Sequence, residues 1–559
     1  MKINLILKVI STAALACISI YAMYCLTQKD ISIFVGQVLV DDAFYYLKPA
    51  QNLIAGKGLS FDGVNLTNGY HPLWMVVTVL ICFFGDIMFQ AKMLSLMGGL
   101  LYLSGALIIS YVGLRNFKYW QKTLIFILFA FNLMQAKIFL QGLESGLNFF
   151  LLTVVVALFV NPKMGDLTQA RNKIIFGTFL ALLALSRVDQ ILLVIFLIVF
   201  LAADSASFNF LKKMSYSQKQ GAIDLYNFSL LIVAPVIILF GAYLIFNYWE
   251  FQTITPVSGM VKKLYETEWL SAGYPNGGFY KNILFHFKYI YGISIGQIWN
   301  SVQFSAFSYF NLSLINIGFI WFLTKISILP LLVGIFNVIK FRNNSRLSKI
   351  LFAYFFFSIF HVILYATQLP HFTIYGTWYF SLEILMITIL YSMGLMYIFD
   401  RIYSFSKGKI PTTIGVILLL PFVLLLSSVT IYESALYGAK DPRVNRFLLA
   451  SEWINSNLPK NIMIGAHSSG TLGYFVEDRS VINLDGLINS YQYYNVLRNG
   501  KFKEYVIDNI DYYSDYSILD LEKEGLCWSG GCVPPNKLTL VKKWHIEGDQ
   551  NYFILKISK

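Results

Sequence analysis

Charge is scarce in this chain: only 13% of its 559 residues are Asp, Glu, Lys or Arg, whereas 57% are hydrophobic. A soluble domain of average composition carries about a quarter charged residues. The shortage argues against an ordinary soluble protein and favours a polytopic membrane protein. The sequence also lacks a Walker loop and a His-Glu-x-x-His motif. Any energy that its chemistry needs must therefore arrive with an activated substrate.

Cysteine is rare as well, with five in the chain. Cys17, Cys25 and Cys82 lie in apolar runs, where cysteine is usually an inert packing residue. Cys527 and Cys532 bracket four residues of a polar tail and suit a small disulfide loop if that tail lies outside the cell. Because no further Cys or His accompanies this pair, we predict no metal site.

Apolar runs long enough to cross a bilayer, about 20 residues each, recur along most of the chain. They predict a mainly α-helical protein with about 11–13 transmembrane helices. The run 72–89 is short, and we expect it not to cross completely. The run 173–203 is interrupted by polar residues 186–190, so it forms either a short hairpin or one bent helix. The clearest runs are 5–26, 93–114, 123–140, 143–160, 228–248, 312–340, 349–366, 376–399 and 411–431.

The formal net charge of +13 could suggest nucleic acid, but its distribution indicates membrane orientation instead. Basic residues in short connections mark cytoplasmic loops. Lys2 and Lys8 precede the first apolar run, which lacks a small-residue cleavage site, so we expect a retained first helix that starts in the cytoplasm. A bacterial inner membrane is the expected location. The basic clusters are Arg115, Lys118 and Lys122; Lys163, Arg171 and Lys173; Lys212, Lys213 and Lys219; Lys340, Arg342, Arg346 and Lys349; and Arg401, Lys407 and Lys409.

The remaining polar connections then fall on the opposite, non-cytoplasmic face, beginning with a first outer loop at 27–71. The composition becomes mixed after residue 431. Residues 462–466 and 480–484 are typical of buried strands, and 443–457 of an amphipathic helix. We therefore predict a transmembrane domain over 1–431 and a small α/β domain over 432–559 on the outer face.

Two adjacent carboxylates, Asp41 and Asp42, stand in the first outer loop. Acids at a membrane rim are costly, which favours a functional role. Neighbouring like charges raise the pKa of one of them, and such a carboxylate can act as a general base on an acceptor hydroxyl. The alternative is that the pair only caps a helix over 43–55, a position that Asp favours.

Other polar residues predicted to bind substrate share this face. Residues 61–72 are dense in amide, hydroxyl and imidazole groups that suit a sugar or phosphate, although the segment could equally be a structured loop. Glu144, Arg187 and Asp189 break apolar runs; these charges either pair with one another or bind substrate. Arg187 and Lys262 are the cations that we predict to bind a phosphate. The candidate substrate-binding residues are Asn68, Tyr70, His71, Glu144, Arg187, Asp189 and Lys262.

The first outer loop resembles that of GT-C glycosyltransferases, the membrane class that includes protein O-mannosyltransferases, aminoarabinose transferases and arabinofuranosyltransferases. That class places an Asp-Asp or Asp-Glu pair before an amphipathic helix. The resemblance covers nearly the whole chain and extends to uncharacterised bacterial members. It rests on Asp41-Asp42-Ala43-Phe44-Tyr45-Tyr46, Phe61-Asp62-Gly63, Thr67-Asn68-Gly69, His71-Pro72-Leu73-Trp74, Gly142-Leu143-Glu144-Ser145, Leu185-Ser186-Arg187-Val188-Asp189, Pro256-Val257-Ser258-Gly259, Gly473-Tyr474-Phe475 and Val481-Ile482-Asn483-Leu484-Asp485-Gly486-Leu487.

The resemblance implies an inverting enzyme that transfers a sugar from a polyprenyl-phosphate donor to an envelope glycan, lipid or protein on the non-cytoplasmic face. Asp41 would be the general base, and Asp42 would orient it or the acceptor. No cofactor is expected. One alternative is a transporter or flippase for a lipid-linked saccharide, which would keep charges near the bilayer midplane. Another is a sensor or scaffold built around the outer domain, in which the acidic loop would be dispensable.

Overall fold

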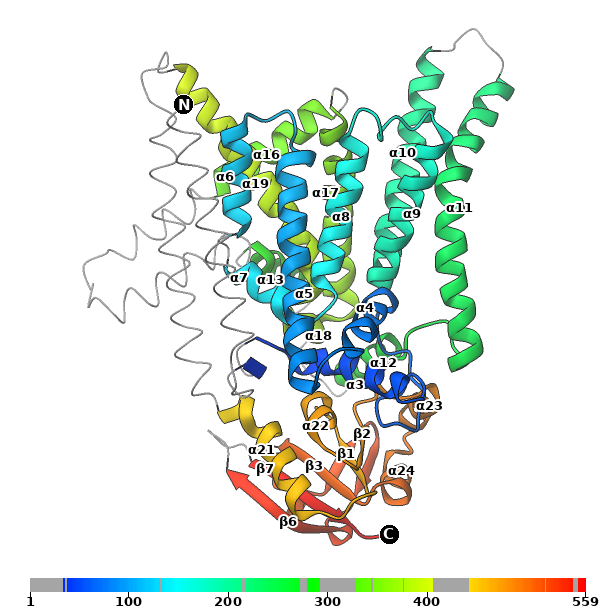
Figure 1. Cartoon of the computed structure of the whole chain (residues 1–559), viewed down its shortest axis with the longest axis vertical. Coiled ribbons are helices and arrows are strands. Elements are labelled where there is room, and N and C mark those ends of the chain that lie inside the picture. The colour runs from blue at the N-terminus through cyan, green and yellow to red at the C-terminus, as the bar shows by residue number, and fades with distance from the viewer. Residues whose placement is uncertain are drawn as a thin grey trace, which may run out of the picture.

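A helical bundle and a small α/β domain make up the computed structural model (Figure 1). The first apolar run (5–26), the run 411–431 and the whole of 292–327 lie outside the described residues, and so do Cys17 and Cys25. The residues that the structure describes are 34–35, 38–130, 133–212, 218–271, 279–291, 328–342, 345–375, 377–405, 442–517, 519–545 and 551–559.

Four helical segments of the described chain are long and apolar enough to cross a membrane: 87–113, 230–251, 346–368 and 378–405. Shorter apolar helices cover 72–82, 145–160, 188–202 and 328–341. The helices of the bundle are α5 (Ile87–Ile108) with its π-helical extension η2 (Ile109–Gly113), α6 (Tyr119–Ala130), α7 (Leu133–Leu140), α8 (Ser145–Val160), α9 (Ala170–Ser186), α10 (Ile191–Lys212), α11 (Gln218–Phe251), α16 (Ile328–Phe341), α17 (Arg346–Gln368) and α19 (Ser381–Phe405).

Small residues let these helices approach closely. A side chain at Gly146 of α8 would clash with the Gly98 backbone of α5, and one at Gly394 of α19 would clash with the Pro330 carbonyl of α16. In a bilayer, where lipid tails are as apolar as leucine, close backbone packing of this kind is a main source of helix association. The glycines therefore have a packing role in the bundle.

The lengths and directions of the helices show how the two ambiguous apolar runs, 72–89 and 173–203, fold. Helix α4 (Pro72–Cys82) has only 11 residues, and both it and the start of α5 lie at the end of the bundle that carries the C-terminal domain (Figure 1). Helix α4 therefore does not run the length of the bundle. The run 173–203 forms a helical hairpin, α9 and α10, whose turn is the short helix η3 (Val188–Gln190).

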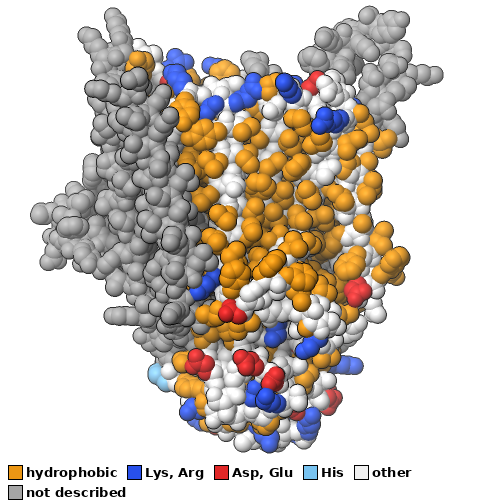
Figure 2. Space-filling view, viewed as in Figure 1, with side chains coloured by type: hydrophobic (Ala, Val, Ile, Leu, Met, Phe, Trp, Pro, Cys, Tyr) orange, Lys and Arg blue, Asp and Glu red, His pale blue; other side chains and the backbone are white. Residues whose placement is uncertain are grey.

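Basic side chains gather at the end of the bundle farthest from the C-terminal domain, and an apolar band separates the two ends (Figure 2). Lys118 pairs with Asp400 there, with 3.1 Å between Nζ and Oδ1. Arg346 donates to the Asn161 carbonyl at 3.3 Å in the same region. The predicted basic loops that the structure describes thus lie opposite the polar connections.

Short helices run along the other end of the bundle, between it and the C-terminal domain (Figure 1). They form because their sequences are amphipathic and too short or too polar to cross a bilayer. They are η1 (Asp41–Ala43), α3 (Phe44–Ile54), α12 (Val257–Ser271), α18 (Pro370–Tyr375) and η5 (Thr377–Phe380). Another short helix, α13 (Phe279–Tyr291), lies deeper and packs against α17 and α19 of the bundle.

The C-terminal domain is built on a five-stranded sheet of order β2-β1-β3-β7-β6. Strand β1 is parallel to β2 and β3, whereas β7 is antiparallel to β3 and β6. The predicted helix over 443–457 and the strands near 463 and 480 are present. The elements are α21 (Pro442–Asn457), β1 (Met463–Ala466), α22 (Gly470–Phe475), β2 (Ser480–Asn483), α23 (Tyr491–Arg498), α24 (Phe502–Asn509), β3 (Tyr512–Ser517), α25 (Leu521–Glu524), β4 (Leu526–Trp528), β5 (Gly531–Val533), η6 (Pro535–Lys537), β6 (Leu538–His545) and β7 (Asn551–Ile557).

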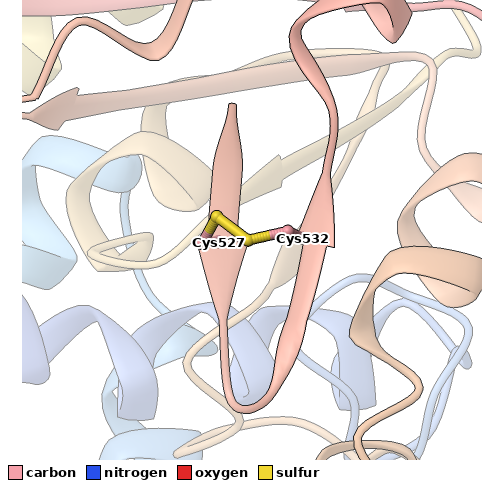
Figure 3. Close-up of a disulfide and its surroundings, with 2 residues drawn as sticks. All are labelled: Cys527 and Cys532. Carbon is pink, nitrogen blue, oxygen red and sulfur yellow. A yellow bond between two sulfur atoms is a disulfide. The ribbon is translucent and has the colours of Figure 1, made fainter. Parts of the chain in front are cut away.

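The two strands β4 and β5 form a small hairpin in which Cys527 and Cys532 are joined by a disulfide (Figure 3). Trp528 of this hairpin donates from Nε1 to the Tyr265 hydroxyl of α12 at 2.6 Å. Ser529 donates to Glu268 of α12 at 2.8 Å. The cross-linked hairpin therefore holds α12 against the domain.

Helix α12 belongs to the core of the C-terminal domain although it lies far from it in sequence. Val257, Val261 and Tyr265, spaced four residues apart on one face, are buried in the same hydrophobic cluster as Ile482 and Leu484. Apolar residues at this spacing form one stripe of a helix. The boundary predicted at residue 432 marks a change in sequence composition. Helix α12, which precedes that boundary, nevertheless packs into the core of the C-terminal domain.

Candidate active site

The predicted site residues come together where the rim helices meet the C-terminal domain. They arrive from η1, the loop before α4, the turn before α8, the α9–α10 turn and α12. Many of these side chains are buried charges, which require partners to be tolerated.

Asp41 joins the two domains. Its Oδ2 accepts from the Gly470 N–H at 2.9 Å, and its Oδ1 accepts from the Thr471 N–H and hydroxyl, each at 2.7 Å. A carboxylate on these first N–H groups caps helix α22. A side chain at Gly470 would clash with the Asp41 backbone, so the contact requires glycine there. Both oxygens of Asp41 are thus occupied by structural hydrogen bonds.

Asp42 is half-buried, and its side-chain carboxylate accepts no hydrogen bond from any described residue. Burial raises the pKa of Asp42 to about 6; Lys262 opposes the rise, and the charges of Asp41 and Glu144 add to it. A carboxylate with that pKa is mainly ionised at neutral pH and is still a useful base. Neither acid caps the helix that follows, because η1 and α3 begin without a side-chain cap.

A third acid, Asp485, enters from the turn after β2. Its Oδ1 accepts from the Leu487 N–H at 2.8 Å, and its Oδ2 accepts from the Tyr45 hydroxyl at 3.3 Å. Burial raises the pKa of Asp485 to about 8, helped by the charges of Asp42 and Asp41. Sequence reasoning noted this residue only within a motif. The signal that could have found it is an Asp-Gly turn directly after a buried strand.

Two cations share the ring of Tyr379 in η5. The Lys262 ammonium lies 5.1 Å from the ring centroid and the Arg187 guanidinium 5.3 Å. Burial by itself lowers the pKa of Lys262, but Tyr379 and Asp42 outweigh it, and the net shift is upward. Lys262 therefore stays protonated beside Asp42.

Arg187 is 2% exposed and lies in a network of acids. Its Nε donates to Asp189 at 3.0 Å, its Nη1 donates to the Trp378 carbonyl at 2.7 Å, and Nη1 lies 3.8 Å from Glu144. Glu144 in turn accepts from the Tyr46 hydroxyl at 2.9 Å. These charges satisfy one another, as one of the two sequence interpretations expects.

His71 links the loop to the network. Its Nδ1 accepts from the Val188 N–H at 3.2 Å, which places the proton on Nε2, 3.5 Å from Glu144. Burial lowers the pKa of His71, with Arg187 and Lys262 adding to the effect and Glu144 and Asp189 opposing it. A neutral His71 that donates to Glu144 fits this environment.

The network continues into the bundle through residues that sequence reasoning did not select. His361 of α17 lies between Glu383 of α19, at 2.8 Å from Nδ1, and Asp189, at 3.6 Å from Nε2. The sequence signal that could have identified His361 and Glu383 is their position as ionisable residues in otherwise apolar helices.

Two of the predicted site residues, Asn68 and Tyr70, make their contacts away from Asp41 and Asp42. Both ends of the Asn68 amide are hydrogen-bonded to the backbone at the start of α12. Its Oδ1 accepts from the Val257 N–H at 3.0 Å, and its Nδ2 donates to the Thr255 carbonyl at 3.3 Å. Tyr70 is 5% exposed and interacts with Tyr243 and Glu250 of α11. Asn68 therefore positions α12, which carries Lys262.

A separate open cavity of about 570 Å³ lies between α12 and α23. Its basic residues are Lys263 and Arg498, and none of the lining residues is acidic. On α12 the lining follows Gly259, Lys263 and Thr267, a different face from that of Lys262. The full lining is Thr255, Gly259, Met260, Lys263, Leu264, Thr267, Tyr494 and Arg498. Within the described residues, no three His, Cys, Asp or Glu side chains are grouped so as to hold a metal ion.

Known proteins share this architecture. A family model described as a domain of unknown function matches residues 438–554, which is the C-terminal domain. A search of curated proteins finds no match. The apo structure of ArnT from Cupriavidus metallidurans superposes with a TM-score of 0.51 at 10% identity, covering 98% of this chain and 99% of ArnT.

Two further structures are similar at lower scores. The undecaprenyl-phosphate complex of the same ArnT gives a TM-score of 0.47 at 10% identity, covering 97% of this chain and 98% of that one. The oligosaccharyltransferase of Archaeoglobus fulgidus gives 0.49 at 13% identity, covering 88% and 68%. The full-length match to apo ArnT confirms the architecture predicted from the sequence: the chain has the fold of GT-C membrane glycosyltransferases with a small C-terminal α/β domain.

Proposed function

We propose that this protein is an integral-membrane glycosyltransferase that moves a sugar from a polyprenyl-phosphate donor to a hydroxyl of an envelope glycan, lipid or protein. The observation that carries the proposal is Asp42, a carboxylate that accepts no hydrogen bond from the described residues and lies beside the Lys262 cation at the membrane rim. The GT-C fold supports the reaction class.

In the proposed reaction the acceptor oxygen attacks the anomeric carbon of the donor sugar. The bond from that carbon to the phosphate oxygen breaks with inversion, and the acceptor proton passes to Asp42. We assign the base to Asp42 because both Asp41 oxygens already accept hydrogen bonds from Gly470 and Thr471. Asp41 then acts by holding the C-terminal domain over the site.

The departing lipid phosphate needs positive charge. Lys262 carries it beside Asp42, and Arg187, whose Nε and Nη1 are already engaged by Asp189 and the Trp378 carbonyl, adds a second positive charge at the same Tyr379 ring. Charge-assisted hydrogen bonds to phosphate are roughly twice as strong as neutral ones. A lipid tail can lie along the apolar bundle while its phosphate reaches these cations, so we propose the outer membrane face as the side of reaction.

The transporter alternative draws on the buried pair of His361 and Glu383, because ionisable residues within membrane helices often form ion or proton paths. This pair is instead connected to Arg187 through Asp189. We therefore propose that it holds the phosphate-binding arginine. A transporter would move a lipid-linked saccharide without forming a new glycosidic bond.

The decisive experiment incubates the purified protein, in lipid nanodiscs, with a panel of polyprenyl-phosphate sugars and of nucleotide sugars, and identifies products by mass spectrometry. We expect transfer only from the lipid-phosphate donors. Asp42→Asn should give no product, whereas Asp400→Asn, a matched change at the far end of the bundle, should behave like the wild type. Transfer from a nucleotide sugar in the absence of any lipid carrier would overturn the proposal.

A further inference from the structure

The turn that carries Asp485 is held rigidly against the membrane domain. The Tyr265 hydroxyl of α12 donates to the Asp485 carbonyl at 2.7 Å. A side chain at Gly69 would clash with the Leu487 carbonyl, so the first outer loop packs directly on this turn. Gly486 adopts a positive φ of 80°, which allows the sharp reversal.

Asn483, at the end of β2, supports the same turn from the other side. Its Nδ2 donates to the Ser469 hydroxyl at 2.9 Å and to the His467 carbonyl at 3.1 Å, and its Oδ1 accepts from the Ile488 N–H at 3.2 Å. Because neighbours on both sides hold the backbone, the Asp485 carboxyl is presented in one place. Groups held in this way suit substrate binding.

The charged and titratable groups that face Asp485 come from four elements: Asp41 and Asp42 of η1, Tyr45 of α3, Tyr265 of α12 and Tyr493 of α23. No cation is among them, whereas Lys262 and Arg187 lie together on the ring of Tyr379. The anionic donor phosphate is favoured on the cationic side of Asp42. The side of Asp42 that faces Asp41 and Asp485 favours an uncharged group, such as the hydroxyl of an acceptor.

We propose that Asp485 is a specificity-determining residue that binds a hydroxyl group of the incoming acceptor beside Asp42. The inference rests on the proposed function and adds to it, since it assigns acceptor recognition to the C-terminal domain. Its Oδ2 accepts a long, 3.3 Å hydrogen bond from the Tyr45 hydroxyl, and the Asn483 side chain also interacts with the carboxyl. A carboxyl oxygen can accept more than one hydrogen bond, so Asp485 can also bond to an acceptor hydroxyl.

The protonation state defines how Asp485 would act. Its raised pKa, about 8, leaves it protonated at neutral pH and ionised above pH 8. A protonated carboxyl donates a hydrogen bond to the acceptor oxygen, and ionisation removes that donor and adds a charge beside Asp42. Asparagine has the same shape and keeps a donor at all pH values.

The test compares Asp485→Asn, Asp485→Ala and, as a control, Asp508→Asn on the exposed face of α24. Steady-state kinetics are measured with a lipid-phosphate sugar donor from pH 6 to pH 9. Asp485→Ala should raise the KM for the acceptor about tenfold or more and leave the donor KM within twofold, consistent with losing a substrate hydrogen bond. Asp485→Asn should work near the wild-type level at pH 7 and keep its activity at pH 9, where the wild type declines.

Each outcome decides the inference. It is overturned if Asp485→Ala leaves the acceptor KM unchanged, if the donor KM rises instead, or if Asp485→Asn declines above pH 8 as the wild type does. Should the alanine variant fail to fold, the isosteric asparagine variant still decides through its pH profile. Failure of the proposed function is a different result, since then the wild type forms no product from any lipid-phosphate sugar.

Discussion

At the scale of single residues, two adjacent acids have opposite environments. Asp41 and Asp42 are alike in sequence, but Asp41 accepts three hydrogen bonds from Gly470 and Thr471, and Asp42 accepts none from the described chain. The bonds from Gly470 and Thr471 occupy both oxygens of Asp41, whereas the Asp42 carboxylate is open to a substrate and burial raises its pKa to about 6. We therefore propose a structural role for Asp41 and a chemical role for Asp42.

Asp42→Asn should lower sugar transfer by about 10²–10⁴-fold, the typical contribution of a general base. The asparagine keeps the size of the side chain but cannot take the acceptor proton. Product formation is measured at saturating donor and acceptor, with thermal unfolding as the check on folding. Turnover within tenfold of the wild type in a folded sample would remove Asp42 from the mechanism.

Asp41→Asn should act mainly on stability. It replaces one accepting oxygen at the start of α22 by an amide, and loss of such a cap typically costs about 1 kcal/mol. We expect a lower unfolding midpoint with at most a partial loss of kcat, measured on the same samples as Asp42→Asn. If Asp41→Asn abolishes transfer without any change in stability, the base belongs at Asp41 instead.

The pH dependence follows from the shifted acids. Transfer needs ionised Asp42, whose pKa is about 6, so activity should fall as the pH drops through 6. It should also fall above pH 8 if Asp485 must be protonated. The profile is therefore a bell with its plateau near pH 7. A flat profile from pH 5 to pH 7 would contradict the role of Asp42.

At the scale of elements, α12 connects the two halves of the site. One face contributes Val257, Val261 and Tyr265 to the core of the C-terminal domain, and an adjacent face of the same turns carries Lys262, which interacts with Asp42. Asn68 fixes the start of the helix, and the disulfide hairpin holds Tyr265. Motion of the domain relative to the bundle would therefore displace the cation.

Removing the disulfide with Cys527→Ser and Cys532→Ser should destabilise the hairpin. Closing a loop of this length is worth about 2 kcal/mol through the entropy of the unfolded chain. We expect a lower unfolding midpoint and a raised KM for the donor, because α12 carries Lys262. Dithiothreitol should weaken the wild type in the same way and leave the double variant unchanged. An equal response of both proteins to the reductant would show that the pair is not a disulfide.

At the scale of the whole molecule, the two ends of the bundle differ in charge. Figure 2 shows basic side chains at one end of the bundle and an apolar band between the ends. Helix α3, which follows the two carboxylates, helix α12, which carries Lys262, and the C-terminal domain lie at the other end (Figure 1). Basic loops face the cytoplasm in most membrane proteins. On that rule we propose that the site faces the outer side of the membrane.

Cysteine labelling tests this orientation. In a background where Cys17, Cys25 and Cys82 are serine and the disulfide is kept, Asp508→Cys on α24 should react with a membrane-impermeant maleimide on intact cells. Thr168→Cys, exposed at the basic end, should react only after the membrane is opened. The reverse pattern would put the site and its domain in the cytoplasm and exclude a lipid-phosphate donor on the outer face.

The sequence alone determined the membrane bundle, the C-terminal α/β domain and the fold class. These features depend on local composition: runs of apolar residues must leave water, and alternating or amphipathic segments must bury one face. The grouping of Glu144, Arg187 and Asp189 could also be predicted, because isolated charges in apolar runs require partners at the same membrane depth.

Only the tertiary structure decided which acid is available for chemistry. Asp41 and Asp42 differ solely in what approaches them: α22 arrives from more than 400 positions away and occupies Asp41 alone. Asp485, His361 and the packing of α12 into the C-terminal domain likewise depend on long-range contacts. Local pattern cannot specify such contacts, because burial and neighbouring charge, which set the pKa of each carboxyl, are properties of the assembled molecule.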